Sequence, residues 1–174
     1  MRGSWSILKR LEDIVVSSII LIIIAIPMLL IAIGVKLSSR GPIIFAQDRY
    51  GLDGRRIRVW KFRSMRVTEN GDKVTQASRN DSRVTPFGSF LRRTSLDELP
   101  QFWNVLVGDM SLVGPRPLPV EESLQCAPWQ RQRLNVKPGL TCVWQVRGRN
   151  TVTFESWMRM DLEYVRRRSF TYDV

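Results

Sequence analysis

Residues 14–35 read IVVSSIILIIIAIPMLLIAIGV, a long run of apolar side chains. It contains no charged residue between Asp13 and Lys36. As a helix it would be roughly 33 Å long, enough to cross a hydrocarbon core of about 30 Å. A signal peptide fits poorly, because its apolar region is usually about 7–15 residues long. The stretch therefore predicts a membrane segment.

Pro27 lies near the middle of this segment, and both ends of the segment are basic. Proline removes one backbone hydrogen bond and clashes with the preceding turn, which kinks or breaks a helix. The positive-inside rule places basic flanks in the cytoplasm. We therefore predict a re-entrant helix over residues 5–36 that breaks at Pro27 and returns to the cytoplasmic face. A kinked helix that crosses the membrane once is the alternative. The basic flanks are Lys9, Arg10, Lys36 and Arg40.

Residues 37–174 are expected to form a cytosolic catalytic domain at the membrane surface. Two extended runs around a Gly51 to Gly54 turn predict a β-hairpin. Thr85 followed by Pro86 signals the start of a helix. A second helix is expected from Ser95 to about Val107. The predicted fold class is mainly α with a small β-hairpin element, in a monotopic membrane protein.

The remainder of the chain adds a loop, a short helix and a long helix. The run GDMSLVGPRPLP, residues 108–119, is dense in Gly and Pro and predicts a loop. The run WQRQRLNV, residues 129–136, is a basic helical piece that suits either a membrane interface or a solvated face. Thr153 is the expected cap of a last strong helix that ends in three arginines. Asp161 falls on the apolar face of this helix, either as the buried partner of an arginine or as a site residue.

Composition restricts the chemistry. The chain has 27 Lys and Arg against 16 Asp and Glu, a net charge of +11, so it is expected to bind anions. It contains no histidine, which excludes histidine acid–base chemistry and histidine-ligated metals. Cys126 and Cys142 have no metal-binding or disulfide spacing. No nucleic-acid recognition pattern is present, so nucleic acid is not an expected partner.

The run LRRTSLDELPQFWN, residues 91–104, places two acids beside two arginines. Acids in a first helical turn are common as caps, so the pair alone is weak evidence for catalysis. Its apolar surroundings and the arginine in the nearby Gly/Pro loop strengthen the interpretation. Carboxylates and arginines without histidine indicate Mg²⁺ and phosphate, because Mg²⁺ prefers oxygen ligands and guanidinium groups bind phosphoryl oxygens. Asp97 and Glu98 are therefore the candidate site.

Four motifs carry a resemblance to a known family. They are KFRSM (61–65), RRTSLDELPQFWNVLVGDMSLVGPRP (92–117), VKPGLTCVWQVRGRN (136–150) and MDLEYV (160–165). With the proline-interrupted apolar segment, the chain from Lys9 onward resembles the bacterial sugar transferases. Larger members of that family have further membrane helices ahead of the re-entrant one, so the chain resembles their catalytic core.

The resemblance implies an enzyme at the cytoplasmic face of the bacterial inner membrane. It would transfer a hexose-1-phosphate from a UDP-sugar to undecaprenyl phosphate with release of UMP, initiating exopolysaccharide, capsule or O-antigen synthesis. Asp97 matches the nucleophile of a covalent phosphosugar intermediate, and Glu98 its partner in binding Mg²⁺. The expected partners are both substrates, the phospholipid membrane and, as an open alternative, a second copy in a homodimer. Other matching residues are Arg92, Arg116 and Arg149 near the phosphates, Lys61 and Arg63 as further candidate phosphate ligands in a family motif, and Asp161 as an additional acid.

A membrane-anchored module that binds an anionic lipid or nucleotide without turnover is the competing hypothesis. Such a module would tolerate Asp97→Asn, whereas the enzyme would not. The sequence does not reveal which sugar is transferred.

Overall fold

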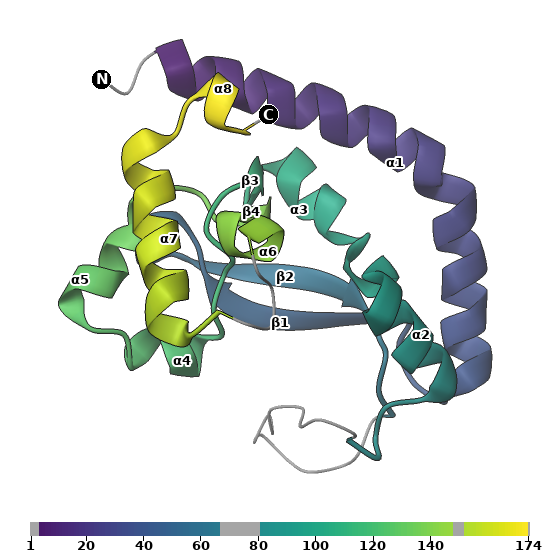
Figure 1. Cartoon of the computed structure of the whole chain (residues 1–174). Helices are drawn as coiled ribbons and strands as arrows, with labels where there is room; N and C mark the ends of the chain where they lie inside the picture. The colour runs from purple at the N-terminus through teal and green to yellow at the C-terminus, as the bar shows by residue number, and fades with distance from the viewer. Residues whose placement is uncertain (1–3, 67–80, 148–151, 174) are drawn as a thin grey trace. The chain divides into compact units, whose positions relative to one another are not determined.

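The computed structural model describes residues 4–66, 81–147 and 152–173. The chain divides into two compact units. The first unit comprises Met1–Ile22, Gln47–Val59 and Gln101–Val174, and the second comprises Ile23–Ala46 and Trp60–Pro100. The described chain is mostly helical with two small two-stranded sheets (Figure 1), which confirms the predicted fold class at that level.

Helix α1, Ser4–Ser38, begins the chain. It is long and apolar enough to cross a membrane, with a hydropathy of 3.1, and only 11% of its apolar window is buried. The helix contains Pro27 and continues on both sides of it, so the predicted break in the helix is wrong. Proline removes only its own bond to the carbonyl four residues earlier, and the neighbouring turns keep theirs. Re-entry to the same membrane face stays a prediction.

The hairpin consists of β1, Ile44–Tyr50, and β2, Arg56–Phe62, as predicted. The strands are joined by a short 3₁₀ turn, η1, Leu52–Gly54. Asp53 adopts a left-handed backbone with φ 55° and Gly54 one with φ 72°. Asp and Gly tolerate this conformation best, so the residue types at the turn account for the reversal.

The second unit has its own apolar core, built where α1 meets helix α2, Pro86–Thr94. Thr85 caps α2, because its side chain accepts a hydrogen bond of 2.9 Å from the Gly88 amide, which confirms the predicted start. At Gly88 an added Cβ would lie 1.9 Å from the Ser64 carbonyl oxygen. Only glycine therefore permits this approach of α2 to the end of β2. The buried core residues are Ile31, Val35, Phe62 and Leu91.

The single helix expected from Ser95 to Val107 is wrong. Ser95 instead ends α2 in a left-handed conformation, with φ 59° and ψ 15°. A 3₁₀ turn, η2, Leu96–Glu98, follows, and helix α3 begins only at Gln101 and ends at Val107. Pro100 directly precedes α3, in keeping with the tolerance of helix starts for a residue that lacks an amide hydrogen.

Within the first unit, two short strands pair in parallel. Strand β3, Ser111–Val113, pairs with β4, Gly139–Thr141, in the register Ser111 to Gly139. The predicted loop over 108–119 is therefore partly wrong, because its apolar centre finds a partner strand far along the chain. Asp13 of α1 is 2% exposed and accepts hydrogen bonds of 3.0 Å from the Ser111 hydroxyl and the Leu112 amide. These bonds attach the first turns of α1 to β3.

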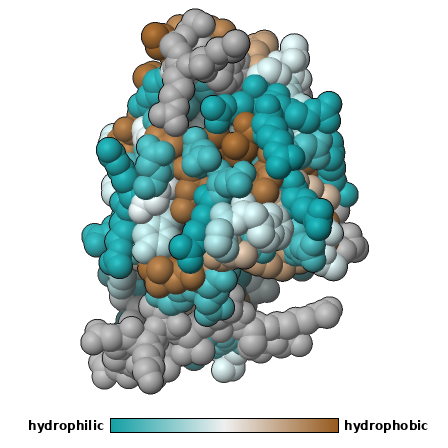
Figure 2. Space-filling view, turned by 90° about the vertical axis from the view of Figure 1, so that its left-hand side faces the viewer, coloured by the Kyte–Doolittle hydropathy of each residue, from teal (hydrophilic) through white to brown (hydrophobic). Residues whose placement is uncertain are grey.

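Short helices and one long helix complete the first unit. Helix α7, Phe154–Arg167, begins at Thr153, whose hydroxyl accepts a hydrogen bond from the Ser156 amide, so both the helix and its cap are confirmed. Residues 129–135 are helical as predicted, whereas Val136 is extended. The side that carries α5, Pro128–Arg131, and α7 is mainly hydrophilic with small apolar patches (Figure 2). The short helices are α4, Val120–Leu124, α5, Pro128–Arg131, η3, Gln132–Asn135, α6, Val143–Arg147, and α8, Phe170–Asp173.

Candidate active site

The acid pair follows a sharp reversal of the backbone in the second unit. Ser95 donates its amide to the Arg92 carbonyl at 3.3 Å, and the Glu98 amide donates to the Ser95 carbonyl at 3.2 Å. A left-handed conformation costs a non-glycine residue about 1–2 kcal/mol. Ser95, the strained residue, lies two positions before Asp97. Backbone strain of this kind is common beside functional side chains.

The two acids have different surroundings. Asp97 is 8% exposed. Glu98 accepts a 2.7 Å hydrogen bond from the Lys61 ammonium group, and both side chains remain partly accessible, at 16% and 21%. A charge-assisted bond of this length is strong, so Lys61 orients Glu98 and adds a positive charge beside Asp97.

The electrostatics of Asp97 combine opposing influences. Burial raises the pKa of its carboxyl above the ordinary value, and the Lys61 and Arg92 cations oppose that rise, while the charge of Glu98 adds to it. A carboxylate with a raised pKa is more basic when ionised, which suits a nucleophile. The local charges therefore keep a reactive carboxylate close to two cations.

Arg92 is fixed at one end only. Its Nε donates a 2.8 Å hydrogen bond to the Ser64 hydroxyl. The side chain is exposed, and no described residue accepts a hydrogen bond from its terminal nitrogens. Because α2 packs closely on Ser64 through Gly88, the guanidinium group of Arg92 is held through Nε. Its two terminal nitrogens are available to donate hydrogen bonds to an anion.

Comparison with known proteins decides the family. The model for bacterial sugar transferases matches residues 4–174. This chain belongs to the bacterial sugar transferase family. It is 52% identical, over its whole length, to a UDP-glucose:undecaprenyl-phosphate glucose-1-phosphate transferase of Escherichia coli K12, of which it covers 39%.

Two further relatives widen the range of sugars. The chain is 46% identical to a protein of the same name from Xanthomonas campestris, with 95% of the chain and 36% of the relative aligned. It is 41% identical to the galactosyl transferase CpsE of Streptococcus agalactiae, with 98% of the chain and 40% of the relative aligned. The chain thus spans about two fifths of the length of these relatives, and the sugars in their names differ.

Other members of the predicted site lie in the first unit of the chain. Asp161 is 1% exposed and its Oδ2 accepts hydrogen bonds of 3.0 and 2.6 Å from Arg133, which also donates to the Arg116 carbonyl oxygen. Burial raises the pKa of Asp161 to about 6 against the pull of Arg133. The interpretation of Asp161 as the buried partner of an arginine is confirmed, and its role near the site stays a prediction.

The predicted site is therefore assembled in part. The second unit brings together Lys61, Arg92, Asp97 and Glu98. Arg63 is 5% exposed and donates to the Ser39 carbonyl and hydroxyl at 2.6 and 3.1 Å, so it binds the end of α1. Arg116 belongs to the first unit, and Arg149 lies outside the described residues.

The sequence analysis missed two residues that support the predicted site. Ser64 holds Arg92, and Arg133 joins Asp161 to the backbone of Arg116. Ser64 lies within the KFRSM motif, which was a usable signal. Arg133 lies among several arginines of a basic helical run, and nothing local distinguishes it from its neighbours.

Two adjacent carboxylates are the available metal ligands. Among the described residues, no group of three or more acids, histidines or cysteines is placed to hold a metal ion. Mg²⁺ usually takes one or two protein carboxylates and completes its shell with water and substrate phosphates. Asp97 and Glu98 fit that requirement, since both are acids on one 3₁₀ turn beside partly accessible space.

Proposed function

We propose that this chain carries the catalytic part of a membrane enzyme that transfers a hexose-1-phosphate from a UDP-sugar to undecaprenyl phosphate. The observation that carries the proposal is the buried Asp97 beside the Glu98–Lys61 pair and the open Arg92 fork, in a chain of this family. The names of the relatives supply the substrate classes. The choice among UDP-sugars is left to experiment, because those names include glucose and galactose.

The proposed reaction has two displacements at one phosphorus atom. An Asp97 oxygen attacks the phosphorus that bears the sugar, and the bond from that phosphorus to the UMP oxygen breaks, so UMP leaves with the electron pair. An oxygen of undecaprenyl phosphate then attacks the same phosphorus and releases the Asp97 carboxylate. The water-soluble donor and the lipid acceptor therefore need not occupy the site together.

The surrounding residues have distinct proposed roles. Lys61 holds Glu98 and offsets negative charge as the donor approaches, and the Arg92 fork binds phosphoryl oxygens. Mg²⁺ held by Asp97 and Glu98 would supply charge neutralisation at the diphosphate. Arg116 and Arg149 remain further proposed phosphate ligands on the strength of the family motifs.

The experiment that tests the covalent route omits the lipid acceptor. Purified protein incubated with UDP-sugar and Mg²⁺ is expected to release up to one equivalent of UMP and to gain the mass of a hexose phosphate on the peptide that contains Asp97. Asp97→Asn should abolish both signals, whereas Asp48→Asn, on the exposed hairpin, should leave both intact. UMP release that requires lipid, with no adduct, contradicts the covalent route. Nucleotide binding unaffected by Asp97→Asn, without turnover of any donor, favours a binding module instead.

We propose that α1 enters the membrane from the cytoplasmic side, bends at Pro27 while its turns continue on both sides, and returns to the same side. Its apolar length and its exposed aliphatic side chains support membrane insertion, and its basic ends support a common side. Single cysteines at Ser6 and at Ser38, in a chain without Cys126 and Cys142, should both react only from the cytoplasm. Labelling of the Ser6 position from outside contradicts re-entry. Pro27→Ala should shift molecules toward a spanning helix, because it restores the missing hydrogen bond.

A further inference from the structure

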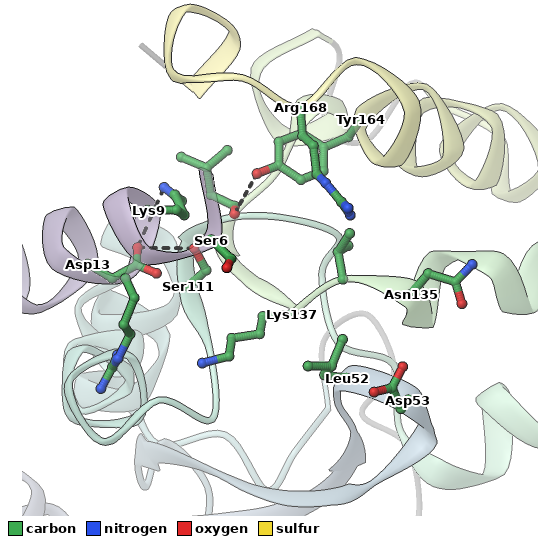
Figure 3. A pocket seen from close by; sticks show the side chains of 13 residues that line it. Ser6, Lys9, Asp13, Leu52, Asp53, Ser111, Asn135, Lys137, Tyr164 and Arg168 are labelled. Carbon is green, nitrogen blue, oxygen red and sulfur yellow. Dashed lines mark hydrogen bonds and ion pairs between the residues drawn. The ribbon is translucent and has the colours of Figure 1, made fainter. Parts of the chain in front are cut away.

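A cavity of about 260 Å³, whose lining includes several charged residues, lies in the first unit. It is enclosed by the start of α1, turn η1, the segment before β4 and the end of α7 (Figure 3). None of its lining residues belongs to the second unit, which contains Asp97 and Glu98. The cavity is therefore lined separately from the acid pair. Its charged lining residues are Lys9, Arg10, Asp13, Asp53, Lys137 and Arg168.

The positive charges of this cavity are unevenly neutralised. Lys9 lies 2.9 Å from an oxygen of Asp173 and 3.5 Å from one of Asp13. In contrast, Arg10, Lys137 and Arg168 form no ion pair with any residue that the structure describes. Arg10 instead donates 2.7 and 2.6 Å hydrogen bonds to the last carbonyls of α3. Three cations thus line one cavity, and none of them forms an ion pair with a described carboxylate.

Two of these cations are held side by side. Gly108 ends α3 with φ 97°, and a Cβ added there would lie 3.2 Å from Arg10 Nη2 and 3.5 Å from Lys137 Nζ. Burial and the Arg10 charge lower the pKa of Lys137, and the nearby carboxylates of Asp13 and Asp109 only partly oppose that shift. Like charges held together in a partly buried place are unfavourable on their own. A bound anion would relieve that repulsion. Arg168 lines the same cavity from the end of α7 (Figure 3).

We propose that this cavity binds the phosphate of an anionic bilayer phospholipid. Its lining includes Ser6, Lys9, Arg10 and Asp13, directly before the apolar run that begins at Ile14. On the same turns of α1, Ile7, Leu8 and Leu11 are exposed. With α1 in a membrane, these turns lie at the level of the lipid headgroups, where basic residues attract anionic lipids. The volume accommodates a phosphate and part of its headgroup, with the acyl chains outside along α1.

This inference rests on the proposed membrane insertion of α1, and its test separates the two. Native mass spectrometry of the purified chain in detergent, titrated with phosphatidylglycerol, should show one lipid bound more tightly than phosphatidylcholine. Lys137→Gln and Arg168→Gln should each weaken it about tenfold, the loss expected for one charge-assisted hydrogen bond. Arg166→Gln, an exposed charge on the same helix end, is the matched control and should bind like the unmodified chain.

Three outcomes overturn the proposal. The first is unchanged phosphatidylglycerol affinity in both cavity variants. The second is binding of inorganic phosphate or glycerol 3-phosphate as tight as that of the lipid, which makes the cavity a site for soluble phosphates. The third is a preference for undecaprenyl phosphate over phosphatidylglycerol, which assigns it to the acceptor. Lys137→Arg should retain the lipid and excludes misfolding as the cause of a loss. Release of the protein from membranes by carbonate would instead contradict the insertion of α1.

Discussion

Two ion pairs of the chain have nearly equal lengths but very different exposure to solvent. Glu98 and Lys61 approach to 2.7 Å and are 16% and 21% exposed, whereas Asp161 and Arg133 approach to 2.6 Å and are 1% and 4% exposed. The first pair is strongly bound but accessible, and the second is sealed. A substrate must reach the group that reacts with it. The accessible Glu98–Lys61 pair therefore suits a reaction site, whereas the buried Asp161–Arg133 pair suits a structural role.

The sealed pair also shows what burial costs. Asp161 keeps one oxygen, Oδ1, buried without a hydrogen-bond partner among the described residues. The Arg133 guanidinium in addition donates to the Arg116 carbonyl and lies 5.7 Å from the centre of the Trp157 ring. Removing either partner would leave a charge in a place without water, which is far more costly than the pair is worth.

The largest expected effect separates the two regions by activity. Asp97→Asn should lower turnover by several orders of magnitude with little change in stability, because it removes the attacking oxygen and keeps the size of the side chain. Asp161→Asn should keep turnover per folded molecule within a few-fold of the unmodified chain. The rate of UMP release, normalised to folded protein, measures both. Equal losses in the two variants would break the comparison and place Asp161 in the reaction, as the family resemblance implies.

The next effect concerns stability. Arg133→Met and Asp161→Leu should each lower the free energy of unfolding by about 3–5 kcal/mol, because each leaves one buried charge unpaired. The double variant should recover most of that loss, since it removes both charges together. Thermal unfolding in detergent, followed by circular dichroism, compares the four proteins. Additive losses in the double variant would show that the two side chains act independently.

The smallest effect is a shift in the pH dependence of activity, set by Asp97 beside the accessible Glu98–Lys61 pair. Asp97 must be ionised to attack, so activity should fall as pH drops through its pKa, which burial raises. Lys61 lowers that pKa, so Lys61→Met should raise it and move the acid limb of kcat/KM to higher pH. Arg131→Met, in the first unit, serves as a control for general charge loss. An acid limb that stays in place or moves to lower pH would contradict the charge arrangement described for Asp97.

Several elements could be predicted because their signals are local. The uninterrupted apolar run predicts α1, the turn residues predict the hairpin, and the caps Thr85 and Thr153 predict the starts of α2 and α7. The adjacency of Asp97 and Glu98 was likewise visible in the chain. The reversal at Ser95 was missed because serine seldom adopts a left-handed backbone, and only packing around α2 holds it there.

The apolar helix, the excess of basic residues and the family motifs follow directly from the order of the residues, because composition and short spacings carry that information. The tertiary structure decided which cation meets which acid: Lys61 reaches Glu98 across 37 positions, and Arg133 reaches Asp161 across 28. It also decided the parallel pairing of β3 with β4, which no local pattern in the sequence of either short strand indicates. The physical reason is that local propensities direct the backbone within a few residues, whereas the partner of a side chain depends on how distant segments pack and on how much water that packing excludes.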